Sequence, residues 1–183
     1  MFNRLFALIV LLILLPIFLT VALAIFIEDG SPIFFKQKRV GINYTFFNIY
    51  KFRSMKKNTP NVATHLLENP ASYLLRIGGV LRKLSLDELP NLINIIKGEM
   101  AFVGPRPALY NQDDLMALRV AAGVDKLKPG ITGWAQINGR DEISIEAKVA
   151  LEKEYLERRS VWFDLVIVVR TFTSVLGSKG VAH

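Results

Sequence analysis

The chain has 183 residues, 51% of them hydrophobic, which suits one compact domain with an appendage. It has no cysteine and two histidines, so disulfides, thiolate metal sites and a cysteine nucleophile are excluded, and a multi-histidine metal site or a Ser-His-Asp triad is disfavoured. A formal net charge of +7 suits anionic headgroups, lipid phosphates or a nucleotide-linked substrate. Nucleic acid is disfavoured because the basic residues are dispersed and match no binding motif.

Residues 5–27 form an apolar run without a charged residue, long enough to cross a hydrocarbon core, which takes roughly 20 apolar residues. Three interpretations are open: a spanning helix, a cleaved signal peptide with a cleavage site at 22–24, or a segment that Pro16 bends back to the face it entered from. Lys36, Lys38 and Arg39 follow the run, so the positive-inside tendency predicts that the rest of the chain is cytoplasmic.

The residue pattern after the apolar run predicts one α/β domain, mostly helical with a short β-hairpin. β-Branched and aromatic residues predict strands at 33–38 and 46–52, joined by a turn. Polar residues at 57–72 predict a surface loop, and apolar residues on one side predict a helix at 72–83. A second helix is expected from about 87 to 97, with Gly98 as its stop signal.

The C-terminal half begins with a loop at 104–107, followed by a helix within 111–122. Residues 128–140 are rich in glycine and proline, which predicts turns and a short hairpin. Two helices are expected after them: a charged one at 144–159 and an apolar one at 161–176. For the apolar helix we favour the membrane interface over the core.

The adjacent carboxylates of Asp87 and Glu88 are the most informative candidates for chemistry. Ser85 and Glu88 have the spacing of a capping box, and on spacing alone plain capping is the commoner explanation. With Ser85 as the N-cap, however, Pro90 would occupy the fifth helical position and disrupt the helix. With Asp87 as the N-cap, Pro90 occupies the third position, where a backbone N–H would have no partner within the helix anyway. We therefore predict Asp87 at the N-cap, ionised beside N–H groups that suit a phosphoryl group. The two carboxylates together would suit Mg²⁺, which prefers hard oxygen ligands and phosphate partners.

Phosphoryl transfer also needs cations that hold the charge of the substrate. A solvated surface charge is the simpler explanation of any single basic residue, so only their joint occurrence near turns is suggestive. The prolines on both sides of Arg106 would hold its guanidinium on a stiff loop. The candidates are Lys51, Arg53, Arg82, Arg106 and Arg140.

Taken together, these residues resemble the bacterial sugar transferase family, the monotopic phosphoglycosyl transferases that act on polyprenyl phosphate. The resemblance extends nearly from end to end of the chain. The matching segments are FFKQ (34–37), RVG (39–41), YKFRSM (50–55), SLDELP (85–90), KGEM (97–100), VGPRP (103–107) and KPGITGWAQINGR (128–140).

The resemblance implies a reaction. In this family the aspartate at the position of Asp87 attacks the β-phosphorus of a UDP-sugar and releases UMP, and undecaprenyl phosphate then takes the covalent phosphosugar. Glu88 matches the acidic partner associated with Mg²⁺. Substrate contacts are expected from Lys51, Arg53, Arg82, Arg106, Gln136 and Arg140.

The resemblance also implies a topology. The N-terminal segment of the family is a re-entrant helix broken near its middle, and Pro16 fits that break. We therefore expect a re-entrant membrane helix at 1–28 and a catalytic domain at 29–183, on the cytoplasmic face of a bacterial inner membrane, with a homodimer left open. The reaction would start the membrane stage of glycan assembly, for an O-antigen, capsule, exopolysaccharide or glycoprotein. The rivals are a membrane-bound phosphohydrolase that uses Asp87 and a non-catalytic module that binds anionic lipid.

Overall fold

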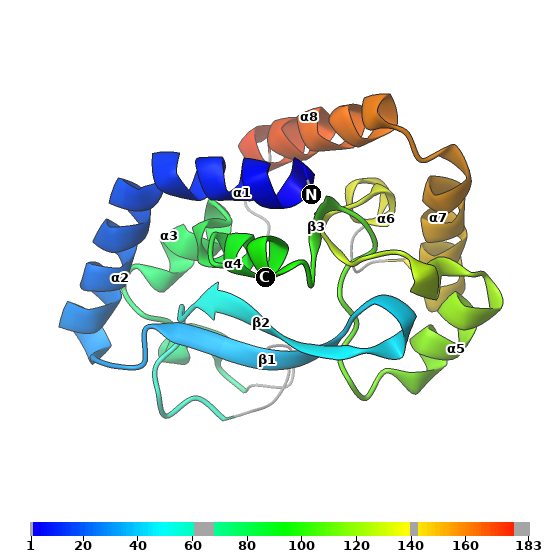
Figure 1. Cartoon of the computed structure of the whole chain (residues 1–183). Helices are drawn as coiled ribbons and strands as arrows, with labels where there is room; N and C mark the ends of the chain where they lie inside the picture. The colour runs from blue at the N-terminus through cyan, green and yellow to red at the C-terminus, as the bar shows by residue number, and fades with distance from the viewer. Residues whose placement is uncertain (1, 61–67, 140–142, 178–183) are drawn as a thin grey trace.

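The computed structural model describes residues 2–60, 68–139 and 143–177. It is mostly helical, with one antiparallel hairpin and one small parallel strand pair (Figure 1). In chain order the elements are helices α1 (Phe2–Ile13) and α2 (Leu15–Asp29), strands β1 (Phe34–Val40) and β2 (Phe46–Phe52), helices α3 (Gly78–Lys83) and α4 (Asn91–Lys97), strand β3 (Ala101–Val103), helix α5 (Asp113–Ala121), strand β4 (Gly130–Thr132), and helices α6 (Trp134–Asn138), α7 (Ile145–Arg158) and α8 (Val161–Gly177).

The N-terminal apolar run folds as two helices, α1 and α2, with a 65° bend between them. Pro16 lies in the first turn of α2, where its missing N–H costs the new helix nothing but interrupts the hydrogen-bond ladder from α1. Among the described residues no single helix is long and apolar enough to cross a membrane; only this bent pair qualifies when its two parts are taken together. The predicted break at Pro16 is confirmed, while the membrane itself stays a prediction.

The β1–β2 hairpin is antiparallel, and β2 has the predicted bounds. Side chains alternate across a strand, so Phe47, Ile49 and Lys51 share one face of β2. Phe47 and Ile49 are buried there with Ile95 of α4 and Ala7 of α1. Helix α4 thus lies between α1 and the hairpin (Figure 1), and Lys51 extends the buried row of β2 to its C-terminal end.

The free edge of β2 is covered by a side chain. The carboxamide of Asn94, fully buried on α4, accepts a hydrogen bond from the Tyr50 amide at 3.1 Å and donates one to the Asn48 carbonyl at 2.7 Å. These are the bonds that a neighbouring strand would make. Asn94 therefore fixes α4 against the hairpin.

The hairpin predicted at 128–140 is wrong. Strand β4 pairs in parallel with β3, which the sequence did not predict, and the residues after β4 form α6. The physical reason is close backbone approach: a Cβ on Gly104 or Gly130 would overlap the backbone of the opposite segment. These glycines indicate contact between two backbones instead of a turn.

The helix predicted at 72–83 is also shorter in the structure, since α3 starts at Gly78. The preceding residues run alongside the end of β2 instead: the Leu75 amide donates to the Ser54 carbonyl at 3.0 Å, and the Lys56 amide donates to Tyr73 at 2.7 Å. A Cβ on Gly78 would overlap the Ser54 carbonyl, so glycine permits this approach. The helices predicted in 111–122, 144–159 and 161–176 are confirmed as α5, α7 and α8.

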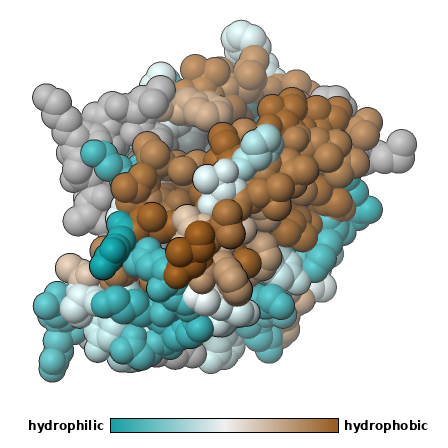
Figure 2. Space-filling view, turned by 90° about the vertical axis from the view of Figure 1, so that its left-hand side faces the viewer, coloured by the Kyte–Doolittle hydropathy of each residue, from teal (hydrophilic) through white to brown (hydrophobic). Residues whose placement is uncertain are grey.

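Large apolar side chains remain exposed on α1, α2 and α8. Figure 2 views the side of the molecule on which α2 lies, and hydrophobic residues cover most of its upper part above a hydrophilic lower edge. Monomeric soluble proteins rarely expose an apolar surface of this extent. The most exposed are Leu5, Leu12 and Ile13 of α1, Leu19, Leu23 and Ile27 of α2, and Val161, Trp162 and Phe172 of α8.

Candidate active site

Asp87 and Glu88 lie in a 3-10 turn, Leu86–Glu88, between α3 and α4. The predicted N-cap at Asp87 is wrong, because α4 begins only at Asn91 and Pro90 itself precedes its first residue. Backbone carbonyls close the turn: the Glu88 amide donates to Ser85 and the Leu89 amide to Leu86, both at 3.2 Å. The sequence thus correctly predicts helical backbone at Asp87 and Glu88, but this backbone is a 3-10 turn. The α-helix itself starts after Pro90.

The Asp87 carboxyl is mostly removed from solvent. Burial raises the pKa of Asp87 above its ordinary value, and neighbouring Glu88 adds to that effect. Lys51 and Arg82 act in the opposite direction and favour the carboxylate. A partly desolvated carboxylate held between cations is typical of functional sites.

Glu88 joins three elements around this turn. Its Oε1 lies 2.7 Å from the Nζ of Lys51 at the end of β2 and 3.9 Å from Nη1 of Arg106 in the loop after β3. Arg82, on α3, donates from Nε to the Ser54 hydroxyl at 2.9 Å. The structure thus brings the predicted Lys51, Arg82 and Arg106 together with the acidic pair.

The substrate contact predicted for Arg53 is not supported. Its guanidinium is buried and makes five hydrogen bonds: to the Asp29 carboxylate and to the carbonyls of Asp29, Gly30, Pro32 and Met55. These bonds use the full donor capacity of an arginine. Arg53 is a structural residue that ties the end of α2 to the end of β2.

Arg39 was not among the predicted site residues, yet it lies at the site. Burial, with a further contribution from Arg106, lowers the pKa of Arg39 to about 10, and Glu88 opposes that shift. Its Nη1 donates to the Pro107 carbonyl at 3.0 Å. Strand alternation could have identified it, because Arg39 pairs with Phe47 in the hairpin and therefore shares the face that carries Lys51.

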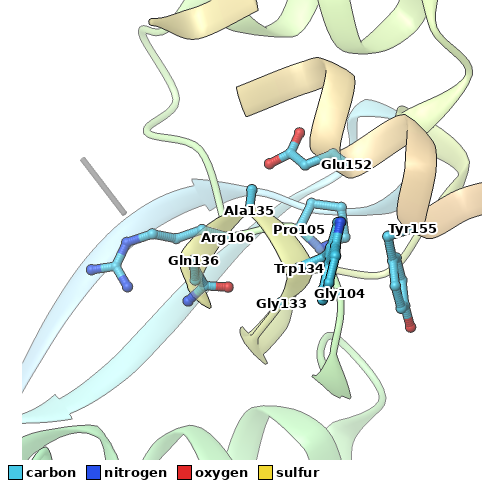
Figure 3. Close-up of a pocket in the computed structure, with 9 residues that line it drawn as sticks. All are labelled: Gly104, Pro105, Arg106, Gly133, Trp134, Ala135, Gln136, Glu152 and Tyr155. Carbon is cyan, nitrogen blue, oxygen red and sulfur yellow. The ribbon is translucent and has the colours of Figure 1, made fainter. Parts of the chain in front are cut away.

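A narrow pocket lies beside the Arg106 loop (Figure 3) and is lined by Gly104, Pro105, Arg106, Gly133, Trp134, Ala135, Gln136, Glu152 and Tyr155. Gln136 donates to the Ile131 carbonyl at 3.0 Å, while its buried Oε1 has no hydrogen-bond partner in the described part of the chain. Gln136 thus lines the same pocket as Arg106, and its predicted substrate contact stays a prediction. Arg140 lies outside the described residues.

The residues at the turn fit a divalent cation in part. Within the described ranges there is no cluster of three or more acidic or histidine side chains that could hold a metal by themselves. Mg²⁺ is usually held by one or two carboxylates together with substrate phosphates. Asp87 and Glu88 supply two such carboxylates. A bound cation would also offset the free-energy cost of desolvating the ionised Asp87 carboxylate.

A family model and several known proteins are similar to this chain over most of its length. The family model described as bacterial sugar transferase matches residues 1–178. The exopolysaccharide production protein ExoY of Sinorhizobium fredii is 40% identical over 98% of this chain and 85% of its own length. The uncharacterized sugar transferase EpsL of Bacillus subtilis is 43% identical over 85% of this chain and 75% of its own length. The UDP-glucose:undecaprenyl-phosphate glucose-1-phosphate transferase of Escherichia coli is 39% identical over 90% of this chain, which corresponds to 37% of that longer protein.

Proposed function

This chain belongs to the bacterial sugar transferase family, and from that premise we propose that it transfers a sugar phosphate from a UDP-sugar to undecaprenyl phosphate and releases UMP. The observation that carries the proposal is the half-buried Asp87 carboxyl, flanked by Lys51, Arg82 and the ion-paired Glu88. Phosphoryl transfer needs positioned cations and a nucleophile of this kind. The product would be the first lipid-linked intermediate of a glycan, such as an exopolysaccharide.

In the first step, an Asp87 oxygen attacks the β-phosphorus of the UDP-sugar. The bond from that phosphorus to the bridging oxygen breaks, and UMP leaves with the bond's electron pair. In the second step, a phosphate oxygen of undecaprenyl phosphate attacks the same phosphorus and displaces the Asp87 carboxylate, which gives undecaprenyl diphosphate sugar. The enzyme returns to its starting state, so the cycle balances without a further reactant.

The surrounding cations hold the charge of the diphosphate. Lys51 and Arg106 already converge on Glu88, and Arg82 favours the ionised form of Asp87. Asp87 and Glu88 would hold Mg²⁺ together with the substrate phosphates, and the ion would supply further charge neutralisation. These fixed charges act where the negative charge of the transition state develops.

We further propose that the protein lies on the cytoplasmic face of a bacterial inner membrane. Support comes from the bent α1–α2 pair and from the exposed apolar side chains of α8, including Trp162 at 73% exposure and Val161 at 89%. An undecaprenyl acceptor is itself confined to the bilayer, so an active site near the lipid surface would meet it directly.

Trapping the sugar phosphate tests the covalent step. Wild-type protein in detergent, with Mg²⁺ and a UDP-sugar labelled at the β-phosphate, should become labelled, and Asp87→Asn should not. Label should then pass to undecaprenyl phosphate when that acceptor is added. Failure to label wild type over a panel of UDP-sugars at saturation would sink the covalent mechanism.

The same assay separates the rival functions. A phosphohydrolase would release free sugar phosphate continuously without lipid acceptor, whereas a transferase sustains UMP release only when undecaprenyl phosphate is present. A non-catalytic lipid-binding module predicts that Asp87→Asn changes no measurable function. Chelation of divalent cations should suppress labelling and leave vesicle binding unchanged.

A further inference from the structure

Two arginines hold the backbone of the loop that carries Arg106. The Arg106 carbonyl accepts a hydrogen bond from Nη2 of Arg119 at 2.9 Å, and the next carbonyl, that of Pro107, accepts one from Nη1 of Arg39 at 3.0 Å. Consecutive carbonyls are therefore bound from α5 and from β1. These bonds fix the backbone from which the Arg106 side chain projects.

Arg119 owes its own position to a buried ion pair. It is 5% exposed on α5, and Glu152 is 2% exposed on α7. Arg119 Nε lies 2.8 Å from one Glu152 oxygen and Nη2 lies 2.5 Å from the other, which is a bidentate geometry. The planar fork of the guanidinium lets Arg119 make both bonds and still donate to the Arg106 carbonyl.

Stability alone gives little reason for this pair. Burying two charges costs desolvation free energy, and well-packed apolar residues are often as stable in their place. The pair instead lies behind the site: Glu152 and Arg106 line the same pocket, and in Figure 3 the Arg106 guanidinium extends away from the Glu152 carboxylate. Glu152 thus binds Arg119 and leaves the Arg106 side chain directed toward Glu88, 3.9 Å away.

We propose that Arg119 is a positioning residue for sugar-phosphate transfer: fixed by Glu152, it holds the Arg106 backbone so that the Arg106 guanidinium meets the substrate phosphates. The inference rests on the proposed function, because it assigns Arg106 a contact with the diphosphate. Arg119 itself touches no reacting atom. Its effect on the rate passes through Arg106.

A double-mutant cycle tests this dependence. Arg119→Lys keeps the charge but has one nitrogen, which cannot bind both Glu152 oxygens and the carbonyl in the same fork. Single-turnover labelling of Asp87 should slow by about 10-fold to 100-fold, the range expected for a misplaced catalytic contact. Arg106→Ala should slow it at least as much. In the Arg106→Ala background, Arg119→Lys should add less than about twofold, because the contact that it positions is gone.

Two further variants keep the test decisive. Arg158→Lys is the matched control, since Arg158 is an exposed arginine on α7 that pairs with Glu154, and it should label at the wild-type rate. Glu152→Gln keeps the side-chain shape and one acceptor for Arg119, so it carries the same cycle if Arg119→Lys does not fold. It should slow labelling in the wild-type background and leave the Arg106→Ala rate unchanged.

The outcomes distinguish this inference from the proposed function. No labelling and no transfer by wild type overturns the proposed function, and the inference with it. An active wild type in which Arg119→Lys and Glu152→Gln slow labelling by the same factor with and without Arg106 overturns the inference alone, because the pair is then purely structural. Wild-type rates in both variants overturn it as well.

Discussion

At the scale of single residues, folding and the proposed catalysis make opposite demands on Asp87. The pKa of its carboxyl is raised in the folded protein, chiefly by burial, so the folded state binds the proton more tightly than the unfolded state does. Ionisation of Asp87 therefore costs stability. This loss of folding free energy begins as the pH rises above the pKa of Asp87 in the unfolded chain, near 3.8. It is complete once the pH exceeds the raised pKa of Asp87 in the folded protein.

From this we predict that Asp87→Asn is inactive but no less stable than wild type. The carboxamide has nearly the same shape and no charge, so it avoids the desolvation cost at neutral pH. Transfer should fall on the order of 10⁴-fold, as for other nucleophiles, while the thermal midpoint at pH 7.5 stays equal or rises. Thermal unfolding of both proteins in detergent, at pH 7.5 and below pH 4, measures this. The gain of Asp87→Asn over wild type in the thermal midpoint should shrink at the lower pH. A midpoint below that of wild type at pH 7.5 contradicts the prediction.

A second prediction concerns the pH dependence of labelling. Because the proposed attack requires an ionised Asp87, the acidic limb of the labelling rate should lie above the ordinary pKa of 3.8. Lys51 lowers the pKa of Asp87, so Lys51→Met should move this limb to higher pH in addition to slowing the reaction. The pH profile of single-turnover labelling gives both values. An unchanged limb in Lys51→Met would show that Lys51 does not act on Asp87.

The same scale shows what sequence could predict about the site. The motifs identified Lys51, Arg82, Arg106 and the acidic pair, which the structure brings together. Basic residues in a motif do not reveal which of them the fold uses for itself. Arg53 is such a case, since four of its five hydrogen bonds go to backbone carbonyls, which no side-chain pattern reports.

At the scale of elements, the N-terminal helix is fixed to the helix that follows the turn of Asp87 and Glu88. Helix α1 packs along α4, and a Cβ on Gly98, just after α4, would overlap the Arg4 guanidinium. Gly98 also has φ +86°, the left-handed conformation that ends helices. The packing of α1 on α4 and the contact between Arg4 and Gly98 therefore couple the apolar N-terminal helix to α4.

We predict that Gly98→Ala destabilises the protein by about 1–2 kcal/mol or more, from the left-handed conformation and the displaced Arg4. Gly79→Ala is the matched control, because a Cβ there meets nothing within 4 Å and the residue lies inside α3. It should be neutral or stabilising by up to about 1 kcal/mol. Chemical unfolding in detergent compares the two variants. Equal midpoints would show that neither the conformation nor the Arg4 contact contributes.

Element boundaries were predictable where the signal is local. Ser144 caps α7 because its hydroxyl accepts a hydrogen bond from the Ala147 amide, and α7 lies within its predicted range. The parallel β3–β4 pair was not predictable, because Ala101 and Gly130 are far apart in the chain and each strand has only three residues. Such pairing is decided by tertiary contacts and not by local preference.

At the scale of the whole molecule, polar and apolar surfaces are separated. The hydrophobic residues gathered on the face in Figure 2 lie above a hydrophilic edge, and α8 adds a second set of exposed apolar side chains. The acidic pair lies in neither apolar set, in the turn between α3 and α4. This separation suits an enzyme that takes one substrate from water and the other from a lipid surface.

The last prediction tests whether α8 serves that surface. Trp162→Glu replaces an amphipathic ring that is 73% exposed with a charge, so vesicle binding should weaken by about 10-fold or more, at roughly 1.4 kcal/mol for each factor of ten. The control is Val120→Glu on α5, where an exposed apolar residue receives the same charge away from α8 and binding should stay unchanged. Sedimentation with vesicles of phosphatidylethanolamine and phosphatidylglycerol measures the binding of both variants.

Labelling of Asp87 in detergent should be normal in the two variants, because the UDP-sugar is soluble in water. Transfer to undecaprenyl phosphate in vesicles should fall only in Trp162→Glu. Equal binding by Trp162→Glu and wild type would mean that α8 does not contact the lipid.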